Sequence, residues 1–452
     1  MTHFRLHSKI NSFIIYLDAN NLYGNAMVKK LPIRNFRWIT PENLNIEKLK
    51  EMKNKGIGFT IEVDIDYPKE LHNLHNDYPL LPESKIVNND MLSKYQIDLK
   101  KKYYSKTLKD GTVKINESSI PKLICSLNDK RNYVVHSDTL LYALEKGIIL
   151  KKIHRGIQYE EEEWLKPYIE FNSKKRAEAK NNFEKDFYKL MNNSGYGMTL
   201  LNARKFSDNV LCNNVEKFIK VIRSHRTKSW TIFNKDLVMV NRYKKKIKLD
   251  RPIYAGFAVL EYSKLHMQKF HYDYIKAKYG DKAKLLFTDT DSLAYHIETN
   301  DLYQDMYDNK EEFDLSNYID KDKNERKFYC DKNKAIIGKF KDETAGVPIT
   351  EFVGLASKTY SLKTDDGKQK ATAKGVKKCV KDKELKHELY KNIALGIDEK
   401  HQHIVSQYNF KSEKHEIYTT KTTKIGLSSF DDKRFILDGV NSLSYGHYKI
   451  NK

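Results

Sequence analysis

The stretch Leu285-Leu-Phe-Thr-Asp-Thr-Asp-Ser-Leu-Ala-Tyr-His-Ile297 decides the fold of this chain. Two apolar runs, 285–287 and 293–297, predict two strands, and the polar residues between them predict a tight turn. Such a turn can hold the carboxylates of Asp289 and Asp291 rigidly at the end of a sheet. Taken alone, an Asp-x-Asp turn is weak evidence, because sugar-nucleotide transferases and ordinary Asx-turns also contain it.

A third carboxylate ends another predicted strand. Phe13-Ile-Ile-Tyr-Leu17 is a short apolar run typical of a buried strand, and Asp18 follows it directly. Two strand ends can therefore bring three carboxylates together. Mg²⁺ commonly takes one or two carboxylates plus substrate phosphates, and two such ions can stabilise both the attacking and the leaving oxygen of a phosphoryl displacement. The alternative for Asp18 is a turn-forming residue after a strand.

Two further Asp-x-Asp triplets fit surface positions better. Asp64 and Asp66 lie on the polar face of a strand, 59–66, in which apolar and polar residues alternate. Asp320-Lys-Asp-Lys-Asn-Glu325 lacks the glycine at the sixth position that a calcium loop requires. We therefore expect a charged surface loop there.

Residues 160–193 predict a helical hairpin. One helix covers 163–171, and Asn172-Ser173 caps a second helix over 174–193. Two helices joined so tightly can project from a sheet.

The second helix of this hairpin carries a polar stripe. Lys185, Lys189 and Asn193 recur every four residues and therefore share one helical face. Two ammonium groups and an amide on one stripe suit a triphosphate. The alternative is a solvated basic face, which is the commoner origin of such a pattern.

The composition indicates a large, strongly basic protein. The chain has 452 residues, with Lys+Arg 82 and Asp+Glu 60, so the net charge is 82 − 60 = +22. A charge of this size attracts polyanions, of which nucleic acid is the commonest, although a highly soluble basic surface is the alternative. Hydrophobic residues make up 40% of the chain, enough for a sizeable core. The length suggests two or three folding units.

The same composition excludes several classes of protein. No apolar run approaches the ~18 to 20 residues that span a bilayer, and the first residues do not resemble a secretory signal. Four separate cysteines without a Cys-x-x-Cys pair disfavour a disulfide scaffold and a zinc ribbon. We expect an intracellular protein with no membrane partner, and nucleus and cytoplasm are not distinguished.

The order of the predicted elements is mixed, which indicates an α+β fold with several subdomains. Residues 84–118 and 198–250 predict little regular structure. The other predicted elements are strands at 13–17, 59–66 and 133–136, a helix from Ser137 or Asp138 to near Gly147, the hairpin, a long helix over 253–279, the two strands around Asp289, and a helix over 382–395 followed by two or three strands.

Four motifs resemble those of family B DNA polymerases and occur in that family's order. Asp18-Ala-Asn-Asn-Leu-Tyr-Gly24 resembles motif A, and Lys189-Leu-Met-Asn-Asn-Ser-Gly-Tyr-Gly197 resembles motif B. Thr288 to Ser292 resembles motif C, and Lys358-Thr-Tyr360 resembles the Lys-x-Tyr motif. The long interval between motifs A and B, and the extra sequence after motif B, look most like the protein-primed subgroup of viruses, linear plasmids and Maverick/Polinton-type elements.

The resemblance implies a right-hand polymerase, with a palm of antiparallel sheet plus helices, helical-hairpin fingers and a small thumb. The implied subdomains are the first part of the palm with an insertion (1–159), the fingers (160–197), a second insertion (198–252), the second part of the palm (253–379) and the thumb (380–452). The basic window Arg242 to Arg251 is either a solvated loop or a contact for template phosphates.

The resemblance also implies roles for single residues. Asp18 and Asp291 would bind two Mg²⁺ ions, for which Mn²⁺ can substitute, with the carbonyl of Ala19 contributing and Asp289 assisting. Tyr23 would lie under the deoxyribose and exclude a 2′-hydroxyl. The implied nucleotide contacts are Tyr23, Lys185, Lys189, Asn193, Tyr196 and Arg176, with Lys175 as an alternative to Arg176 on the same helix, and the implied primer contacts are Lys358 and Tyr360.

Three departures from the family pattern are chemically mild. Asn21 and Gly24 stand where the family usually has Ser and Pro, and Phe287 stands where Tyr is usual. A larger departure concerns proofreading, because the chain's one Asp-x-Glu, Asp382-Lys-Glu384, follows motif C. We therefore expect a polymerase module without its 3′–5′ exonuclease.

The expected function is DNA-directed DNA polymerisation by a two-metal mechanism. The expected partners are template and primer DNA and deoxynucleoside triphosphates, with a terminal protein as a further candidate primer. The alternative is a catalytically inactive, DNA-binding remnant of such a polymerase. A reverse transcriptase is disfavoured, because Asp-Thr-Asp-Ser replaces the Tyr-x-Asp-Asp turn.

Overall fold

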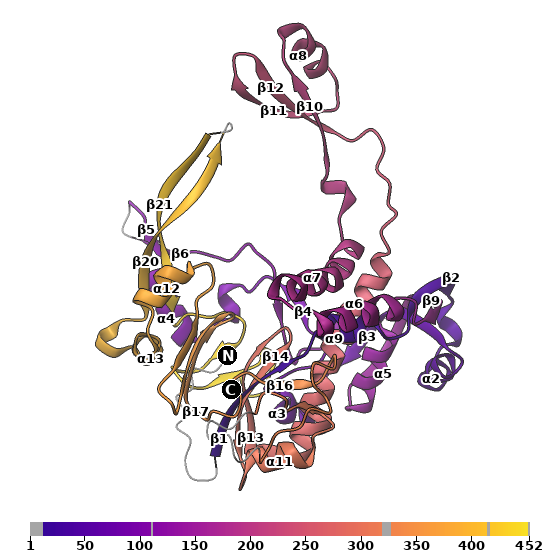
Figure 1. Ribbon diagram of the computed structural model, residues 1–452, viewed down its shortest axis with the longest axis vertical. Helices are drawn as coiled ribbons and strands as arrows, with labels where there is room; N and C mark the ends of the chain where they lie inside the picture. Colours follow the sequence, from indigo (N-terminus) through magenta and orange to yellow (C-terminus); the bar gives the residue numbers. More distant parts are fainter. Residues whose placement is uncertain (1–11, 110–111, 319–326, 414–415, 451–452) are drawn as a thin grey trace.

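The computed structural model in Figure 1 describes residues 12–109, 112–318, 327–413 and 416–450. The segment Asp320–Glu325, expected to be a surface loop, lies outside the described residues. Within those ranges no helix is both long and apolar enough to cross a membrane.

A large sheet carries the predicted Asp-Thr-Asp turn. The strand order is β13 (Ala283–Asp289), β14 (Ser292–Glu298), β1 (Ser12–Ala19), β17 (Ile349–Ala356), β18 (Thr359–Thr364) and β19 (Gln369–Thr372). β16 (Phe340–Asp342) pairs with the end of β1, and β15 (Phe313–Asp314) pairs with β16. Neighbours are antiparallel except β15 and β16. The three strands predicted around the carboxylates are confirmed.

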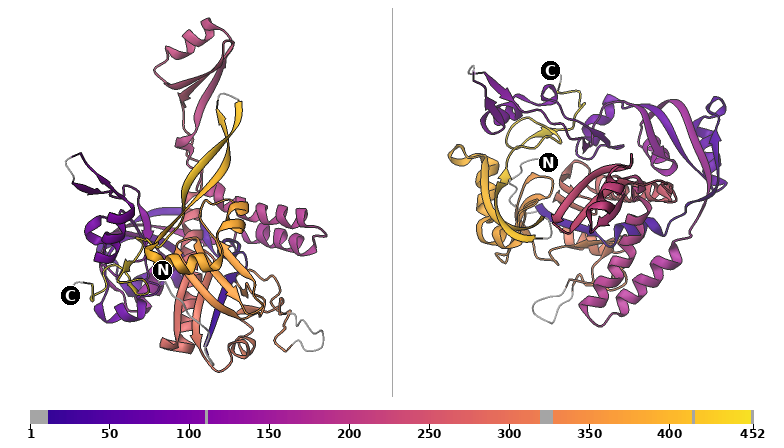
Figure 2. Two further views of the ribbon diagram at one scale, coloured as in Figure 1. Left: turned by 90° about the vertical axis from the view of Figure 1, so that its left-hand side faces the viewer. Right: turned by 90° about the horizontal axis from the view of Figure 1, so that it is seen from above.

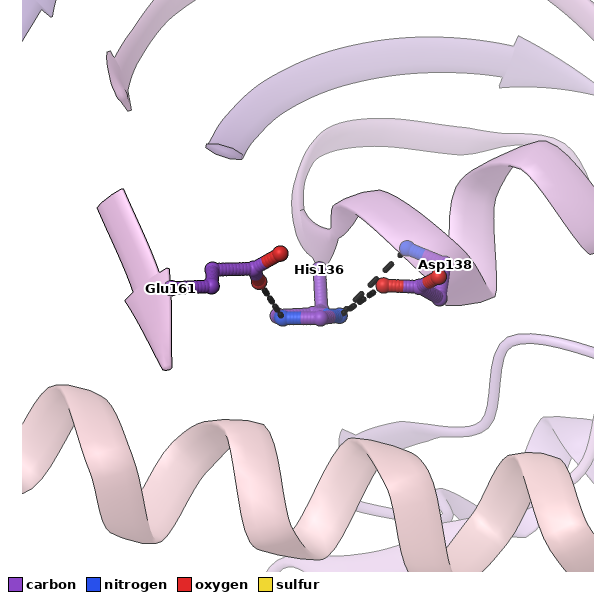
Figure 3. A group of neighbouring side chains, drawn as sticks. All are labelled: His136, Asp138 and Glu161. Atoms are coloured by element: carbon purple, nitrogen blue, oxygen red, sulfur yellow. Dashed lines mark hydrogen bonds and ion pairs between the residues drawn. The ribbon is translucent and has the colours of Figure 1, made fainter. Parts of the chain in front are cut away.

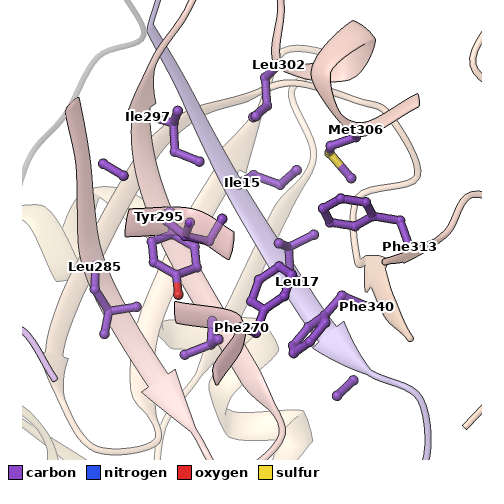
Figure 4. Close-up of a cluster of buried hydrophobic side chains, with 14 of the residues drawn as sticks. Ile15, Leu17, Phe270, Leu285, Tyr295, Ile297, Leu302, Met306, Phe313 and Phe340 are labelled. Atoms are coloured by element: carbon purple, nitrogen blue, oxygen red, sulfur yellow. The ribbon is translucent and has the colours of Figure 1, made fainter. Parts of the chain in front are cut away.

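A long helix packs against this sheet, and the core between them is rich in aromatic side chains, several of which are drawn in Figure 4. α9 (Ile253–Lys269) continues through a π-helical turn, η5 (Phe270–Lys276), into α10 (Ala277–Tyr279), which confirms the predicted long helix. Phe270 stacks on Phe340 with ring centroids 3.7 Å apart, and Leu17 and Tyr295 belong to the same core. Because these residues come from β1, β14, β16 and the helix, the core fixes the strand ends that bear the aspartates.

A second sheet has the order β2 (Leu31–Ile39), β9 (Ile149–Glu162), β3 (Ile57–Asp66) and β8 (Lys130–His136). As the alternation predicted, Phe59, Ile61, Val63 and Ile65 of β3 are buried, while Asp64 and Asp66, on the other face, are partly exposed and pair with His154 and Arg131. The helices α2 (Ile46–Asn54) and α5 (Ser137–Glu145) pack on this sheet. The helix predicted after β8 is confirmed, but its N-cap is His136.

The helical hairpin is confirmed, but the predicted break at Asn172–Ser173 is wrong. The hairpin consists of α6 (Lys166–Glu178) and α7 (Asn182–Thr199). Asn181 accepts a hydrogen bond from the backbone N–H of Glu184 at 2.9 Å, and the Glu184 carboxylate accepts one from the N–H of Lys180 at 3.0 Å. Asn181 thereby satisfies one of the first backbone donors of α7, and Glu184 holds the residue before the cap, whereas Asn172 is buried within α6.

Both segments expected to be irregular contain regular structure, so that expectation is wrong. The first contains α4 (Lys94–Tyr103) and the short pair β5 (Ser105–Thr107) with β6 (Val113–Ile115), and at its start β4 (Glu83–Lys85) pairs with β7 (Lys122–Ile124), which follows the segment. The second contains β10 (Ser207–Cys212), α8 (Val215–Ile222), β11 (Thr227–Asn234) and β12 (Leu237–Tyr243), which form a small module standing away from the body (Figures 1 and 2). The three-residue strands β4 to β7 are too short to show a period, whereas β12 begins with an apolar run, Leu237-Val-Met-Val240, that our sequence analysis overlooked.

The C-terminal region begins with two helices where one was predicted. They are α12 (Lys378–Glu384) and α13 (His387–Leu395), and they are followed by a long hairpin of β20 (Gln402–Glu413) and β21 (Glu416–Ser428). The hairpin projects from the body in the same direction as the β10–β12 module (Figure 2). After the hairpin come β22 (Phe435–Ile436) and β23 (Ser442–Leu443), and Tyr445 packs with Val87 and Ile124 of the first insertion.

Candidate active site

The three predicted carboxylates lie at one end of neighbouring strands. Asp18 lies opposite Ser292 at the end of β1, and Asp289 lies opposite the same serine across the β13–β14 turn. The backbone N–H of Ala19 donates to the carbonyl of Asp291 at 2.7 Å, which ties the two strand ends together. The predicted convergence of Asp18, Asp289 and Asp291 is therefore present in the fold.

The turn between Asp289 and Asp291 is strained. Thr290 has a φ of +59°, in the left-handed region that a β-branched residue rarely adopts. The N–H of Asp291 donates to the carbonyl of Asp289 at 2.7 Å, so Thr290 is the single residue between the two bonded groups. Such a conformation costs about 1–3 kcal/mol and persists only where flanking structure imposes it. Here two paired strands impose it.

The negative charges of the carboxylates in this site repel one another. Burial raises the pKa of Asp18 to about 7, and the charges of Asp291 and Glu343 add to the rise. Burial also raises the pKa of Asp291, and the charge of Asp289 adds to this rise. Aspartate carboxylates and a backbone carbonyl, at Ala19, are oxygen ligands of the kind that Mg²⁺ prefers. The residues present therefore fit the expected divalent ion.

The two predicted lysines act on this group from different elements, and Lys370, which pairs with Glu343, also lowers the pKa of Asp18. The ammonium of Lys358, in the turn between β17 and β18, lies 2.8 Å from Oδ1 of Asp289. From α7, the charge of Lys189 opposes the rise in pKa of both Asp18 and Asp291. The fold thus places the two predicted lysines close to the carboxylates.

Tyr23 and Tyr196, both predicted as nucleotide contacts, lie face to face. Their ring centroids are 4.4 Å apart and the rings are within 15° of parallel. Tyr23 belongs to α1 (Leu22–Met27) and Tyr196 to the last turns of α7. The stack joins the helical hairpin to the segment that follows Asp18.

Asn21 and Gly24, the two residues that differ from the usual motif A, depend on each other in the structure. Asn21 caps α1 with a φ of +45°, and its side-chain oxygen accepts a hydrogen bond from the N–H of Gly24 at 3.3 Å. A Cβ at position 24 would lie 2.2 Å from Nδ2 of Asn21. Glycine at 24 is therefore the residue that leaves room for this cap.

Tyr360 lies inside the large sheet, with 4% of its surface exposed. Its hydroxyl lies 2.9 Å from that of Tyr16, whose hydroxyl also donates to Oγ of Ser292 at 3.3 Å. A chain of hydroxyls thus connects the Lys-x-Tyr motif to the Asp-Thr-Asp turn. Our sequence reasoning missed Tyr16, because its place in the run 13–17 indicated only core.

Three predicted nucleotide contacts lie on the hairpin but do not touch the carboxylates in the described part of the chain. Lys185 and Asn193 are exposed on α7. Arg176 and its neighbour Lys175 are on α6, so the expectation that they share a helix with Lys189 is wrong. Lys175 pairs with Glu178 at 3.1 Å.

A cavity of about 480 Å³ opens beside the strained turn. Tyr23, Asp289 and Lys358 line it, together with Lys433 and Arg434 of the C-terminal region. The cavity leaves space for a ligand next to Asp289, whereas Asp18 and Asp291 do not line it.

A second group of ionisable side chains lies in the second sheet (Figure 3). The ring of His136 lies between two carboxylates, with Nδ1 3.5 Å from Asp138 and Nε2 3.7 Å from Glu161. The ammonium of Lys53 lies 2.9 Å from Asp138 and 2.7 Å from Glu161. Because Lys53 already supplies the cation, we interpret this group as a buried ion-pair cluster and not as a metal centre.

Comparison with known proteins identifies relatives of this architecture. The family model of DNA polymerase type B, organellar and viral, matches residues 5–277, more than half of the chain. Among solved structures, phi29 DNA polymerase complexed with primer-template DNA is 13% identical, with a TM-score of 0.50 over 94% of this chain and 60% of that one. The orthorhombic crystal form of phi29 DNA polymerase gives 13% identity, 94% and 61% coverage and the same TM-score.

These likenesses show the fold and agree with the resemblance to the protein-primed subgroup. The chain spans about 60% of the length of the phi29 polymerase chain. No curated protein sequence matches it.

Proposed function

Because this chain belongs to the type B DNA polymerases of organelles and viruses, we propose that it is a DNA-directed DNA polymerase. It would add deoxynucleotides to a primer 3′-hydroxyl opposite a DNA template. The observation that carries this proposal is the meeting of Asp18, Asp289 and Asp291 at two tied strand ends, with Lys358 and Lys189 beside them.

The carboxylates would hold two Mg²⁺ ions, with Mn²⁺ as a substitute. Asp18 and Asp291 would be the principal ligands, and the carbonyl of Ala19 and the carboxylate of Asp289 would assist. When bound, such ions stabilise charge on the attacking and leaving oxygens of a phosphoryl transfer. The tie between Ala19 and Asp291 keeps the two strand ends in one arrangement, so little reorganisation is needed when substrate binds.

The helical hairpin would bind the triphosphate. Lys189 supports this role because its charge acts on both Asp18 and Asp291. Lys185 and Asn193 lie on the same exposed stripe of α7, one turn before and one turn after Lys189. The stacked rings of Tyr23 and Tyr196 would form the floor under the sugar. Arg176, on α6, would act only as a longer-range phosphate contact.

The subdomains would follow the polymerase pattern. We propose palm (1–159 with an insertion, and 253–379), fingers (160–197), a second insertion (198–252) and thumb (380–452). Lys358 would contact the primer strand in the cavity beside the turn, and Tyr360 would support that contact from inside the sheet. A protein hydroxyl is the alternative primer.

Primer extension tests the proposal. The chain should extend a DNA primer on a DNA template with Mg²⁺ and deoxynucleotides, and Asp291→Asn should abolish extension without loss of DNA binding. The matched control is Asp66→Asn, a surface aspartate of the second sheet paired with Arg131. Absence of extension by the wild-type chain, with salt-sensitive DNA binding retained, would favour the inactive DNA-binding remnant.

A further inference from the structure

Asp314 is a buried carboxylate next to the candidate site, with none of its surface exposed. It belongs to β15, which pairs with β16, and β16 in turn pairs with β1 at Asp18 and Ala19. A buried carboxylate is costly unless it is paired and hydrogen-bonded. The partners of Asp314 therefore indicate what it is for.

Those partners come from three separate segments. Oδ2 accepts hydrogen bonds from the side-chain amide of Asn20 at 2.8 Å and from the N–H of Ala335 at 3.0 Å. Oδ1 accepts from the N–H of Ser316 at 3.1 Å, and the ammonium of Lys341 lies 3.6 Å from Oδ2. Burial alone would raise the pKa of Asp314, but these hydrogen bonds hold it below its usual value. The group is thus an ionised acceptor at neutral pH.

Asn20 is the partner that leads to the site, because it directly follows Ala19. Its backbone N–H donates to the carbonyl of Lys339 at 2.9 Å, and its own carbonyl accepts from the N–H of Gly338 at 2.7 Å. Asn20 therefore makes three hydrogen bonds: one through its side-chain amide to Asp314, and one through each of its two backbone polar groups. On the other side, the N–H of Ala19 is bonded to Asp291.

We propose that Asp314 is a positioning residue for the divalent-cation site. Through Asn20 it holds the backbone that presents the carboxylate of Asp18 and the carbonyl of Ala19. The inference rests on the proposed function, because that function requires a cation at these oxygens. Residues that orient metal ligands typically change metal affinity or activity 10- to 100-fold when removed.

A role in folding alone makes a different prediction. Asp314 also joins Ser316 and Ala335, so its loss could destabilise the chain without any effect on the site. Cation affinity separates the two roles, because a folding role would not change the affinity of the protein that remains folded.

The test measures Mn²⁺ binding to the full chain by electron paramagnetic resonance, with folding followed by thermal melting. Asp314→Ala should weaken the Asp291-dependent Mn²⁺ binding by about 10- to 100-fold. Asp314→Asn, which keeps an acceptor oxygen for Asn20, should recover much of that affinity. Asn20→Ala should weaken binding in the same direction, and the double variant should be no weaker than Asp314→Ala alone, because both act on one contact.

Asp305→Ala is the matched control. Asp305 accepts hydrogen bonds from Thr299 and Tyr279 in the same half of the chain, away from Asn20, so its loss should leave Mn²⁺ affinity unchanged. If Asp314→Ala does not fold, the Mn²⁺ affinity of Asn20→Ala tests the positioning role in its place. Wild-type affinity in Asn20→Ala, or an equal loss in Asp305→Ala, would overturn the positioning role and leave the proposed function intact. Wild-type Mn²⁺ binding that does not depend on Asp291 would overturn both.

Discussion

The ammonium of Lys358 lies 2.8 Å from Oδ1 of Asp289, so a lysine of one turn neutralises a carboxylate of another. The two residues are 69 positions apart in the chain and meet because β17 and β18 belong to the same sheet as β13. The side chain of Lys358 is 56% exposed, and the hydrogen bond to Asp289 raises its pKa. Lys358 therefore stays charged and can contact both the site and an incoming polyanion.

Lys358→Met should weaken binding of primer-template DNA and make it less sensitive to salt. Each phosphate contact that is lost lowers the slope of log affinity against log salt by about 0.9. Fluorescence anisotropy between about 50 and 200 mM salt measures this slope. Lys50→Met, at an exposed position of α2, should leave the slope unchanged. An unchanged slope in Lys358→Met would exclude a phosphate contact.

Tyr23→Ala should admit ribonucleotides. The ring of Tyr23 is stacked on Tyr196 and fills the place proposed for the sugar edge, so its removal frees room for a 2′-hydroxyl. We expect the preference for deoxynucleotides, measured as a ratio of kcat/KM values, to fall at least about tenfold. Tyr23→Phe keeps the ring and should keep the preference. Equal behaviour of the two variants would contradict steric exclusion.

Lys53→Met should strongly destabilise the second sheet. Without the ammonium, Asp138 and the buried carboxylate of Glu161 would face each other around His136. Removal of one partner from a buried ion pair typically costs about 3–5 kcal/mol in the free energy of unfolding. Urea denaturation measures the loss. Lys55→Met, which breaks an exposed pair with Glu51, should cost less than about 1 kcal/mol. Similar costs for both would mean that the cluster contributes little.

Acid should destabilise the chain below pH 6.5, even without loss of its ion pairs. Burial lowers the pKa of His75 to about 4 and that of His271 to about 3, whereas an unfolded histidine titrates near 6.5. The folded state therefore binds fewer protons than the unfolded state between these values. The contribution of the two neutral histidines to the free energy of unfolding is fully present above pH 6.5 and is lost as the pH falls toward 4.

The pH series of urea midpoints tests this assignment. His271→Phe should flatten the fall in stability between pH 6.5 and 4, even if the variant is less stable at pH 7 because Tyr295 loses its hydrogen bond. An equally steep fall in the variant would exclude His271 as a source.

The carboxylates could be predicted from the sequence because each follows an apolar run that ends there. Asp18 ends the run 13–17, and Asp289 and Asp291 lie between two others, so periodicity alone located three strand ends. The break in the helical hairpin was placed wrongly, at Asn172 instead of Asn181. Both are good caps, and the decisive signal was Glu184 three residues after Asn181.

The residues around the carboxylates were harder to predict. Glu343 and Asp314 belong to segments with no motif of their own, and Tyr16 has the pattern of a core residue. The strands β4 to β7 have three residues each and show no period, and the apolar run at the start of β12 does not reveal its partners, so these pairings became visible only in the fold.

Local sequence patterns were enough to locate the ends of the strands around the carboxylates, the helix with the lysine stripe and the motifs that resemble a family. Those properties depend on neighbours in the chain, because side-chain periodicity and capping act over a few residues. In contrast, the bond between Asp314 and Asn20, 294 positions apart, and the pair of Lys358 with Asp289 became known only from the folded chain. Such contacts depend on how the sheet and its core pack, and local patterns contain no record of that packing.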